Sequence, residues 1–383
     1  MLDPFGGNWV GRHGRHRGMP PLERLSRLVA RAERIPTGLF YLPVVLRWFG
    51  LALRYRSLTL PTVANPMIET GGFWGESKSA CMDQVGTEQR CWLADYVSLA
   101  CSGGDAGDDL ARASKLMDGA GLDFPVVAKP DIGWQGYGVR LVADAGQLRQ
   151  YLAAFPIGER VLLQRPVPHD GEAGVFYARL PGEAEGRVFS LTLRYFPYVV
   201  GDGRSSLREL VLRNPRAGWK AHYHLGGDPE HLGLGQQELE RVPAEGELVR
   251  LAFIGSIRVG GLYRDVRQFI TLALSRRFDA IARSMPEFYF GRFDIRFESL
   301  QRLQAGEGFS IIEINGAGSE AIHIWDPELP LRTVYRELFQ AQDLMFEIAA
   351  CNRARGFRPA GVVRFLATAV RQHRLLGRYP PSG

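Results

Sequence analysis

The fold is decided by two short stretches near the C-terminal end, Gly291–Arg296 (GRFDIR) and Phe309–Asn315 (FSIIEIN). Each predicts a buried strand, because apolar residues alternate with a few polar ones. In the second stretch this alternation places Glu313 and Asn315 on one face. If the two strands are neighbours, Asp294 adds a second carboxylate to that face. Two carboxylates and an amide, without His or Cys, favour Mg²⁺ over zinc. The alternative is a half-solvated sheet face without a metal.

A second feature lies upstream, in Phe124–Val139 (FPVVAKPDIGWQGYGV). A β-rich run ends in Lys129, and a loop containing Gly133, Gly136 and Gly138 leads into another β-rich run. Glycines let backbone N–H groups approach an anion, and a lysine adds a compact cation that can meet a phosphate. The segment has neither the Gly-Lys-Ser/Thr of a P-loop nor the Rossmann fingerprint. Such hairpins are often purely structural. The position of this one before the acidic strands is what favours a role in phosphate binding.

The order of these motifs resembles the ATP-grasp superfamily, particularly ligases such as D-alanine–D-alanine ligase and cyanophycin synthetase. The resemblance runs from about Gly75 to Pro327. It implies an α+β fold in which two α+β subdomains grip ATP between antiparallel sheets, with a short N-terminal helical region. Strands and helices without strict βαβ alternation also indicate α+β. We therefore expect a disordered basic tail over 1–18, a helical region over 19–74, the ATP-grasp domain over 75–350 and a basic tail over 351–383.

The resemblance also implies which residues hold the nucleotide. Lys78 and Lys129 match the two nucleotide lysines, and Lys129 also belongs to the catalytic set. Val161–Val167 matches the linker strand along the adenine edge, and Glu172 matches the acidic residue for the ribose. Gln164 stands where many relatives have glutamate, but its amide can still meet an adenine edge. The expected nucleotide-binding residues are Lys78, Lys129, Gly133, Gly136, Gly138, Gln164, Val167 and Glu172.

A second set follows from the resemblance for the metal, the phosphoryl group and the substrates. Asp294, Glu313 and Asn315 match the ligands of two Mg²⁺ ions, for which Mn²⁺ can substitute. Arg292 matches the arginine that steadies the transferring phosphoryl group. The sequence after Asn315 (GAGSEAIH) departs from D-alanine ligases in the region that faces the acceptor, so the substrates stay unidentified. The expected substrate-binding residues are Gly260, Gly261, Ser319, Glu320 and His323, although a capping turn explains the last three equally well.

The resemblance implies an ADP-forming carboxylate–amine ligase. Transfer of the γ-phosphoryl group of ATP to a carboxylate gives an acyl phosphate, which an amine attacks to form an amide. Such a transfer needs mainly charge neutralisation and alignment. The expected partners are a small carboxylate and a small amine. Two alternatives stay open: a phosphotransferase of the same fold, and a nucleotide-binding, membrane-peripheral protein without ligase activity.

Composition is typical of a globular protein. Of the 383 residues, 45% are hydrophobic and 23% are charged. The net charge is +6, and much of the excess lies in Arg12–Arg17 and in Arg371, Arg374 and Arg378. We expect no nucleic-acid binding, because these basic runs lack an interleaved aromatic platform. Four scattered cysteines without a C-x-x-C pair indicate a reducing compartment, and the N-terminal residues lack an apolar signal. We therefore expect a cytoplasmic protein.

One apolar run raises the question of a membrane contact. Leu39–Leu53 (LFYLPVVLRWFGLAL) is shorter than the ~20 residues of a transmembrane helix and has Arg47 near its centre. We expect it to pack on the chain's own core or in a homodimer contact, with Arg47 facing a carboxylate. The alternative is a peripheral membrane contact, since basic, aromatic-rich amphipathic segments lie in membrane interfaces.

Periodicity predicts the remaining elements. Apolar residues at helical spacing indicate an amphipathic helix over 19–34, and the pattern over 58–65 indicates a strand. Further helices are expected over 108–120, 145–155, 266–285 and 331–351.

Overall fold

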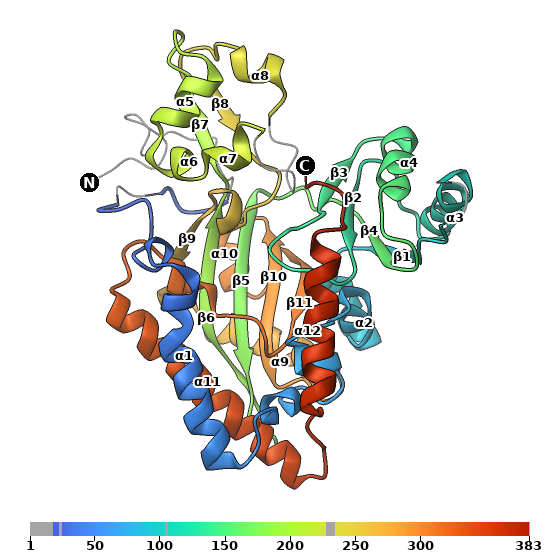
Figure 1. Cartoon of the computed structure of the whole chain (residues 1–383), viewed down its shortest axis with the longest axis vertical. Helices are drawn as coiled ribbons and strands as arrows, with labels where there is room; N and C mark the ends of the chain where they lie inside the picture. The colour runs from blue at the N-terminus through green and yellow to red at the C-terminus, as the bar shows by residue number, and fades with distance from the viewer. Residues whose placement is uncertain (1–17, 23–24, 104–105, 227–233, 383) are drawn as a thin grey trace.

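The structure is a computed structural model that describes residues 18–22, 25–103, 106–226 and 234–382. The basic tail expected over 1–18 lies, except for Gly18, outside these residues. The described chain folds around two antiparallel sheets and a smaller third unit (Figure 1). Mixed helices and antiparallel strands confirm the predicted α+β class.

A four-stranded sheet forms the first unit. All neighbouring strands are antiparallel, in the order β1 (Tyr96–Ala100), β4 (Arg160–Gln164), β2 (Val126–Pro130) and β3 (Arg140–Val142). Helices α3 (Ala106–Gly119) and α4 (Ala145–Ala153) share one apolar core with it. Strands β2 and β3 are the two arms of the glycine-bearing hairpin, so that prediction is confirmed.

A five-stranded antiparallel sheet forms the second unit. Its strands follow the order β11 (Phe309–Asn315), β10 (Phe290–Phe297), β5 (Gly171–Ala178), β6 (Arg187–Tyr195) and β9 (Leu262–Asp265). The pairing of β10 with β11 confirms that the two deciding stretches are neighbouring strands.

The period of two divides the residues of this sheet between its faces. Ala173, Val175 and Tyr177 on β5 share a core with α9 (Leu272–Ser284). Phe176 and Ala178, on the opposite face, belong to a second core. On β10, Phe293, Ile295 and Phe297 join the α9 core. The polar residues between them therefore emerge together on the face opposite α9.

Two long helices, α1 (Thr37–Tyr55) and α11 (Leu331–Ala354), cover part of that opposite face (Figure 1). On α1, Leu51 and Ala52 are buried, and Arg47 donates two hydrogen bonds to the carboxylate of Asp343 at 2.6 and 2.7 Å. The expected packing of Leu39–Leu53 on the chain's own core, with a carboxylate for Arg47, is therefore confirmed for one side of this helix.

The C-terminal stretch is not a tail. A helix, α12 (Val362–Leu376), follows α11 and buries Gln372, Leu375 and Leu376. Figure 1 shows α12 in front of β10 and β11. The backbone N–H of Gly75 donates to Gln372 Oε1 at 2.6 Å. The prediction of a basic tail over 351–383 is therefore wrong, because one face of this basic helix packs against the domain.

A small two-stranded unit follows β6. Its strands are β7 (Tyr198–Val200) and β8 (Leu248–Arg250), which pair antiparallel and share a core with neighbouring short helices. A capping box formed by Ser206 and Glu209 begins the first of these helices. The helices are α5 (Leu207–Arg213), α6 (Pro215–Trp219), α7 (Ala221–His224) and α8 (Gln236–Glu240).

Three predictions of local structure need correction. The described part of 19–34 contains only the short helix η1 (Ala32–Arg34), although Leu25 and Leu28 are buried. Residues 58–65 contain the 3₁₀ turn η2 (Leu60–Val63) and no strand. The helix expected over 266–285 begins only at Leu272. The other short elements are η3 (Glu69–Gly72), α2 (Lys78–Asp83), η4 (Thr87–Trp92), η5 (Ile257–Val259), η6 (Arg267–Phe269), α10 (Leu300–Gln304) and η7 (Ile322–Trp325).

The described part of the chain contains no candidate membrane span. None of its helices combines the length and the apolar character that a bilayer crossing requires.

Candidate active site

A cavity of about 820 Å³ lies between the four-stranded and the five-stranded sheet. The first sheet contributes Lys129 and Gln164, and the second contributes Glu172, Asp294 and Glu313. Its volume lies within the roughly 300–1,000 Å³ that small-molecule sites occupy. The two sheets therefore bring together most of the residues that the sequence singled out.

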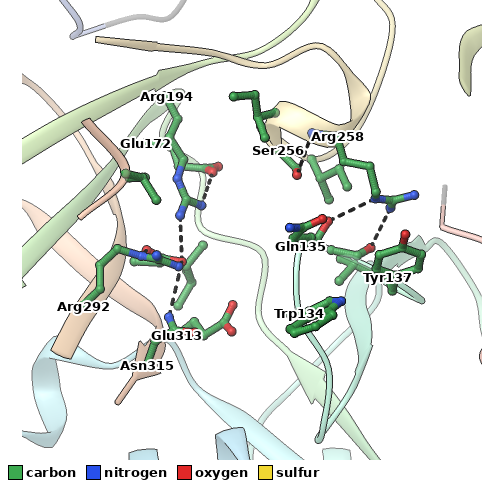
Figure 2. Close-up of a pocket in the computed structure, with 18 of the residues that line it drawn as sticks. Trp134, Gln135, Tyr137, Glu172, Arg194, Ser256, Arg258, Arg292, Glu313 and Asn315 are labelled. Carbon is green, nitrogen blue, oxygen red and sulfur yellow. Dashed lines mark hydrogen bonds and ion pairs between the residues drawn. The ribbon is translucent and has the colours of Figure 1, made fainter. Parts of the chain in front are cut away.

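The acidic residues are direct neighbours across two strands. The register of β10 with β11 pairs Asp294 with Glu313 and Arg292 with Asn315. All four side chains line the cavity, and Figure 2 shows Arg292, Glu313 and Asn315 together on one side of it. The predicted shared face is confirmed, whereas metal binding by these residues stays a prediction.

Asp294 is deeply buried between two arginines. Its carboxylate lies 2.6 Å from Arg292 Nε and 2.9 Å from Arg194 Nη2. Burial by itself would raise the pKa of Asp294, but the two guanidinium groups outweigh it and hold that pKa below its usual value. The carboxylate is therefore ionised at neutral pH, as a metal ligand must be.

The donor set combines two carboxylates with the amide of Asn315, whose Nδ2 lies 3.5 Å from Asp294 Oδ2. No group of three His, Cys, Asp or Glu side chains forms a metal site within the described ranges. Hard oxygen donors at the wall of this cavity nevertheless fit Mg²⁺, which keeps several waters and needs only one or two carboxylates.

The two lysines flank Glu313. Lys78 Nζ lies 3.6 Å from Glu313 Oε1 and donates to the carbonyl of Gly133 at 2.7 Å. Lys129 Nζ donates to Gln164 Oε1 at 2.9 Å and to the carbonyl of Ile312 at 2.7 Å. Burial lowers the pKa of Lys129 to about 8, although nearby carboxylates oppose that shift. Three distant segments of the chain thus place two cations beside one carboxylate.

The glycine loop forms the facing wall of the cavity. Gly136 and Gly138 have φ angles of +78° and +69°, a conformation that glycine adopts most easily. Trp134, Gln135 and Tyr137 lie across the cavity from Glu313 (Figure 2). The loop therefore lies where it can cover a ligand held by the two lysines.

Glu172 is held by two arginines. Its carboxylate lies 3.2 Å from Arg194 Nη1 and 3.0 Å from Arg296 Nε. Arg194 therefore joins Glu172 to Asp294, a link that our sequence analysis missed (Figure 2). A charged residue in the apolar run of β6 was the available signal. Gln164 and Val167 also line the cavity, and contacts of these residues with a nucleotide stay predictions.

Ser319 and Glu320 line the cavity as expected. Tyr41 donates its hydroxyl to Glu320 Oε1 at 2.6 Å, and Trp325 Nε1 donates to Glu320 Oε2 at 3.2 Å. Burial raises the pKa of Glu320, although these two hydrogen bonds and Arg292 oppose the shift. Both residues remain candidates for contact with a substrate.

The other three predicted substrate residues do not line the cavity. His323 is 1% exposed, and its Nδ1 lies 2.8 Å from Ser190 Oγ in the interior. The carbonyls of Gly260 and Gly261 accept hydrogen bonds from the buried Arg216 at 3.2 and 2.6 Å. Each of these three residues therefore has structural contacts away from the cavity, and a direct substrate contact by them stays a prediction.

Glu76 also belongs to the site, although the sequence directed attention only to its neighbour Lys78. It lines the cavity, and its Oε1 accepts the backbone N–H of Gly316 at 2.7 Å. Burial raises the pKa of Glu76 to about 7, against the opposing effects of Gly316 and Lys78. The hydrogen bond from Gly316 to this carboxylate fixes the turn that follows Asn315.

Arg258 was also missed. It is buried at the cavity wall and donates to the carbonyls of Gln135 and Gly136, at 3.3 and 3.4 Å (Figure 2). Within the described residues no carboxylate pairs with it, and its Nη1 has no hydrogen-bond partner. A buried cation without a compensating charge favours an anion in the cavity. An arginine two residues before Gly260 was the signal in the sequence.

The C-terminal segment holds the glycine loop. Tyr379 donates its hydroxyl to the carbonyl of Ile132 at 2.7 Å. Ser382 Oγ donates to the carbonyl of Gly136 at 2.8 Å and accepts the N–H of Gly138 at 3.1 Å. Arg258 Nη2 donates to the same Oγ at 3.1 Å. No local pattern in the sequence indicates these contacts, since they join residues far apart in the chain.

No family model matches the chain, and no curated protein is significantly similar to it. Among solved structures it is similar to the bifunctional glutathione synthetase from Pasteurella multocida, with 19% identity, 69% of this chain and 36% of that chain covered, and a TM-score of 0.34. It is also similar to the D-cycloserine synthetase DcsG, with 14% identity, 72% of this chain and 69% of that chain covered, and a TM-score of 0.35. A third similar structure is the VanG D-Ala:D-Ser ligase from Enterococcus faecalis, with 12% identity, 70% of this chain and 61% of that chain covered, and a TM-score of 0.35.

The chain spans about a third of the length of the glutathione synthetase. The TM-scores are low, so the chemistry of the site follows from the chain's own residues.

Proposed function

We propose that the chain is an ATP-dependent, ADP-forming ligase that joins a small carboxylate to a small amine. The observation that carries this proposal is the pairing of Asp294 with Glu313 at the cavity, with Lys78 and Lys129 beside Glu313. Oxygen donors and buried cations together suit a polyphosphate with its divalent metal.

The reaction proceeds in two balanced steps. A carboxylate oxygen attacks the γ-phosphorus of ATP, the bond to the bridging oxygen breaks, and ADP leaves. The amine nitrogen then attacks the carbonyl carbon of the acyl phosphate, inorganic phosphate leaves with the bonding pair, and the nitrogen loses a proton to solvent. The overall products are the amide, ADP and phosphate.

The residues of the chain supply charge and alignment. Lys78 and Lys129 neutralise phosphate oxygens, and Arg292, held against Asp294, steadies the group in transfer. Asp294, Glu313 and Asn315 would hold Mg²⁺, which when bound neutralises the developing charge on the phosphates. The glycine loop excludes water, which would otherwise hydrolyse the acyl phosphate.

Several finer points belong to the same proposal. They are two Mg²⁺ ions, replaceable by Mn²⁺, adenine contacts at Gln164 and Val167, and ribose contacts at Glu172. Ser319 and Glu320 face the acceptor. The four cysteines are free thiols, as we expect for a protein of the cytoplasm.

The test measures ADP and phosphate release while acids and amines are supplied singly and in pairs. Release that requires both, with an amide found by mass spectrometry, supports the ligase. Release with the acid alone, together with a phosphorylated product, would replace it by the phosphotransferase. Nucleotide binding without turnover for any pair would leave a nucleotide-binding protein and overturn the ligase.

A further inference from the structure

Helix α1 leaves one side uncovered. Leu39, Leu42, Leu46, Phe49 and Leu53 are all at least half exposed, and Leu53 is 80% exposed. Their spacing of three, four, three and four residues places them in one stripe along the helix. The buried Leu51 and Ala52 lie on the other side, against α11. A stripe of this size is unusual on the surface of a soluble monomer.

Helix α12 repeats the pattern. Val363, Leu366 and Val370 are exposed at spacings of three and four residues, and Val363 is 82% exposed. Its opposite side buries Leu375 and Leu376. Two helices from opposite ends of the chain thus each present an apolar stripe to the solvent.

The charged residues of the two helices themselves are of one sign. No Asp or Glu occurs between Glu33 and Glu69, or anywhere after Glu347, whereas both stretches contain several arginines. Some of these arginines pair with carboxylates elsewhere on the domain. Arg54, Arg56 and Arg374 are exposed and have no ion pair within the described residues.

Both helices reach the cavity and contact Phe73. The ring of Phe73 lies 5.6 Å from that of Trp48 on α1 and 5.9 Å from that of Phe365 on α12. Phe73 lines the cavity, as do Tyr41 on α1 and Gln372 on α12. Both helices that carry an exposed apolar stripe therefore also contribute a residue to the candidate active site.

We infer that the exposed sides of α1 and α12 form a docking surface for an anionic lipid bilayer. Apolar stripes on helices that contain arginines and no acidic residue complement a layer of acyl chains beneath negative headgroups. A second copy packed through the same surface would bring arginines against arginines, since neither helix contains an acidic residue. The inference concerns binding alone and does not depend on the ligase reaction.

The experiment measures co-sedimentation of the full chain with vesicles in the absence of ATP. The first vesicles contain equal parts of phosphatidylcholine and phosphatidylglycerol, and the second contain phosphatidylcholine alone. We expect the chain to bind the anionic vesicles, more weakly as salt is added, and to leave the neutral ones unbound. Removing a positive charge should weaken this binding about five-fold per arginine, in Arg54→Gln and Arg56→Gln.

Two double variants make the test specific. Leu46→Ser with Phe49→Ser removes side chains of α1 that are 63% and 51% exposed. Leu272→Ser with Leu212→Ser removes side chains that are 63% and 55% exposed on α9 and α5. The first should bind anionic vesicles at least tenfold more weakly, whereas the second should bind them like the wild type.

Three results would overturn the inference. The first is no vesicle binding by the wild type, and the second is equal binding by the two double variants. The third is a dimer in light scattering that Leu46→Ser with Phe49→Ser dissociates while no variant binds vesicles, which would assign the surface to a second copy. Each result leaves the outcome of the ligase assay untouched.

Discussion

Glu313 is the carboxylate of the site that keeps access to the cavity. Its side chain is 24% exposed, whereas that of Asp294 is 4% exposed and is held by two arginines. A divalent metal that enters the cavity can therefore reach Glu313 without displacing an ion pair of comparable strength. Lys78, 3.6 Å away, is too distant for a strong hydrogen bond to it.

Replacing Glu313 by Gln should reduce substrate-dependent ADP release by about 10²–10³-fold, because the amide removes a negative charge at the phosphates without changing volume. The measurement is steady-state ADP release, with circular dichroism to verify folding. Glu307→Gln is the control, since Glu307 is an exposed carboxylate in the loop between β10 and β11. Undiminished release in a folded Glu313→Gln protein would remove Glu313 from the metal site.

Lys129 should make the affinity for ATP depend on pH. Its pKa of about 8 means that the amine of the empty protein is charged below pH 8 and neutral above it. A neutral amine offers the phosphates no charge, so the Kd for ATP should rise about tenfold per pH unit above pH 8. Titration calorimetry between pH 7 and 9.5 measures this slope.

Variants of Lys129 and Lys78 distinguish the contributions of the two lysines to ATP binding. Lys129→Arg stays charged and should give a flat profile, whereas Lys129→Met should bind ATP weakly at every pH. Lys78→Met should weaken ATP binding less than Lys129→Met does, because the charge of Lys78 already interacts with Glu313 and with the carbonyl of Gly133. Wild-type affinity in Lys129→Met would exclude Lys129 from the nucleotide site.

Much of the candidate site was predictable at the scale of single residues, because it depends on patterns within short stretches of sequence. Alternation along one strand is enough to place Glu313 and Asn315 on a common face. Arg194 and Arg258 were not predictable in this way, because their partners lie on other strands and loops. The burial of His323 was not predictable for the same reason: its sequence neighbours suggest an exposed loop, whereas it lies beside Ser190 and Glu337 in the interior.

At the scale of elements, the glycine loop is a hairpin connection fastened from outside its own sheet. Lys78, Arg258, Tyr379 and Ser382 all donate to its carbonyls. The loop is therefore held in a single position over the cavity, and the C-terminal segment contributes two of its supports.

Removing those supports should loosen the loop. In Tyr379→Phe with Ser382→Ala, the amides of Gly136 and Gly138 should exchange with deuterium about five-fold faster for each lost hydrogen bond, since each contributes ~1 kcal/mol. Hydrogen exchange followed by mass spectrometry reads this directly. Arg378→Gln, an exposed change in the same segment, should leave exchange as in the wild type. Unchanged exchange in the double variant would show that the C-terminal contacts do not restrain the loop.

The junction of α11 with η7 should control stability in acid. His323, whose Nε2 lies 3.7 Å from Glu337 Oε2, and Arg267, whose Nη1 lies 3.1 Å from Glu337 Oε1, lower the pKa of Glu337 to about 2, from about 4.5 in an unfolded chain. The stabilisation from this carboxylate is fully present above pH 4.5 and is lost as the pH falls towards 2. Urea denaturation should therefore show a smaller loss of unfolding free energy between pH 4.5 and 3 in Glu337→Gln. An identical pH dependence in both proteins would contradict this assignment.

Predictions of elements failed where long-range packing decided the conformation. The pattern over 19–34 indicated a helix, and its leucines are buried, but they enter the α9 core from an irregular segment. The run over 58–65 has the apolar character of a strand, yet it packs as the turn η2 against α11. Hydrophobicity predicted burial correctly in both cases and secondary structure incorrectly, because tertiary packing overrides local preference.

At the scale of the whole molecule, the candidate site belongs to neither sheet alone. Lys129 and the glycine loop belong to the four-stranded unit, whereas Asp294 and Glu313 belong to the five-stranded unit. Each unit has its own apolar core. A ligand that contacts both sides should therefore strengthen the connection between the two units.

MgATP should accordingly stabilise the whole chain against heat. A ligand at one hundred times its Kd adds about 2.7 kcal/mol to the free energy of unfolding, which for a chain of this size raises the Tm by a few degrees. Differential scanning fluorimetry with ATP plus Mg²⁺, ATP plus EDTA and Mg²⁺ alone measures the metal-dependent part. EDTA should abolish most of the rise, because under the proposed function Asp294 and Glu313 would hold Mg²⁺, which would neutralise the phosphates.

Glu313→Gln serves as the matched variant in this assay. Its Tm without ligand should be close to that of the wild type, since Glu313 is partly exposed and its one ion pair is long. Its rise in Tm with MgATP should equal the smaller rise that ATP plus EDTA gives in the wild type, because the lysines still bind the phosphates. An equal response of both proteins to Mg²⁺ would place the metal away from β11, and no response of either to ATP would exclude the space between the sheets as a nucleotide site.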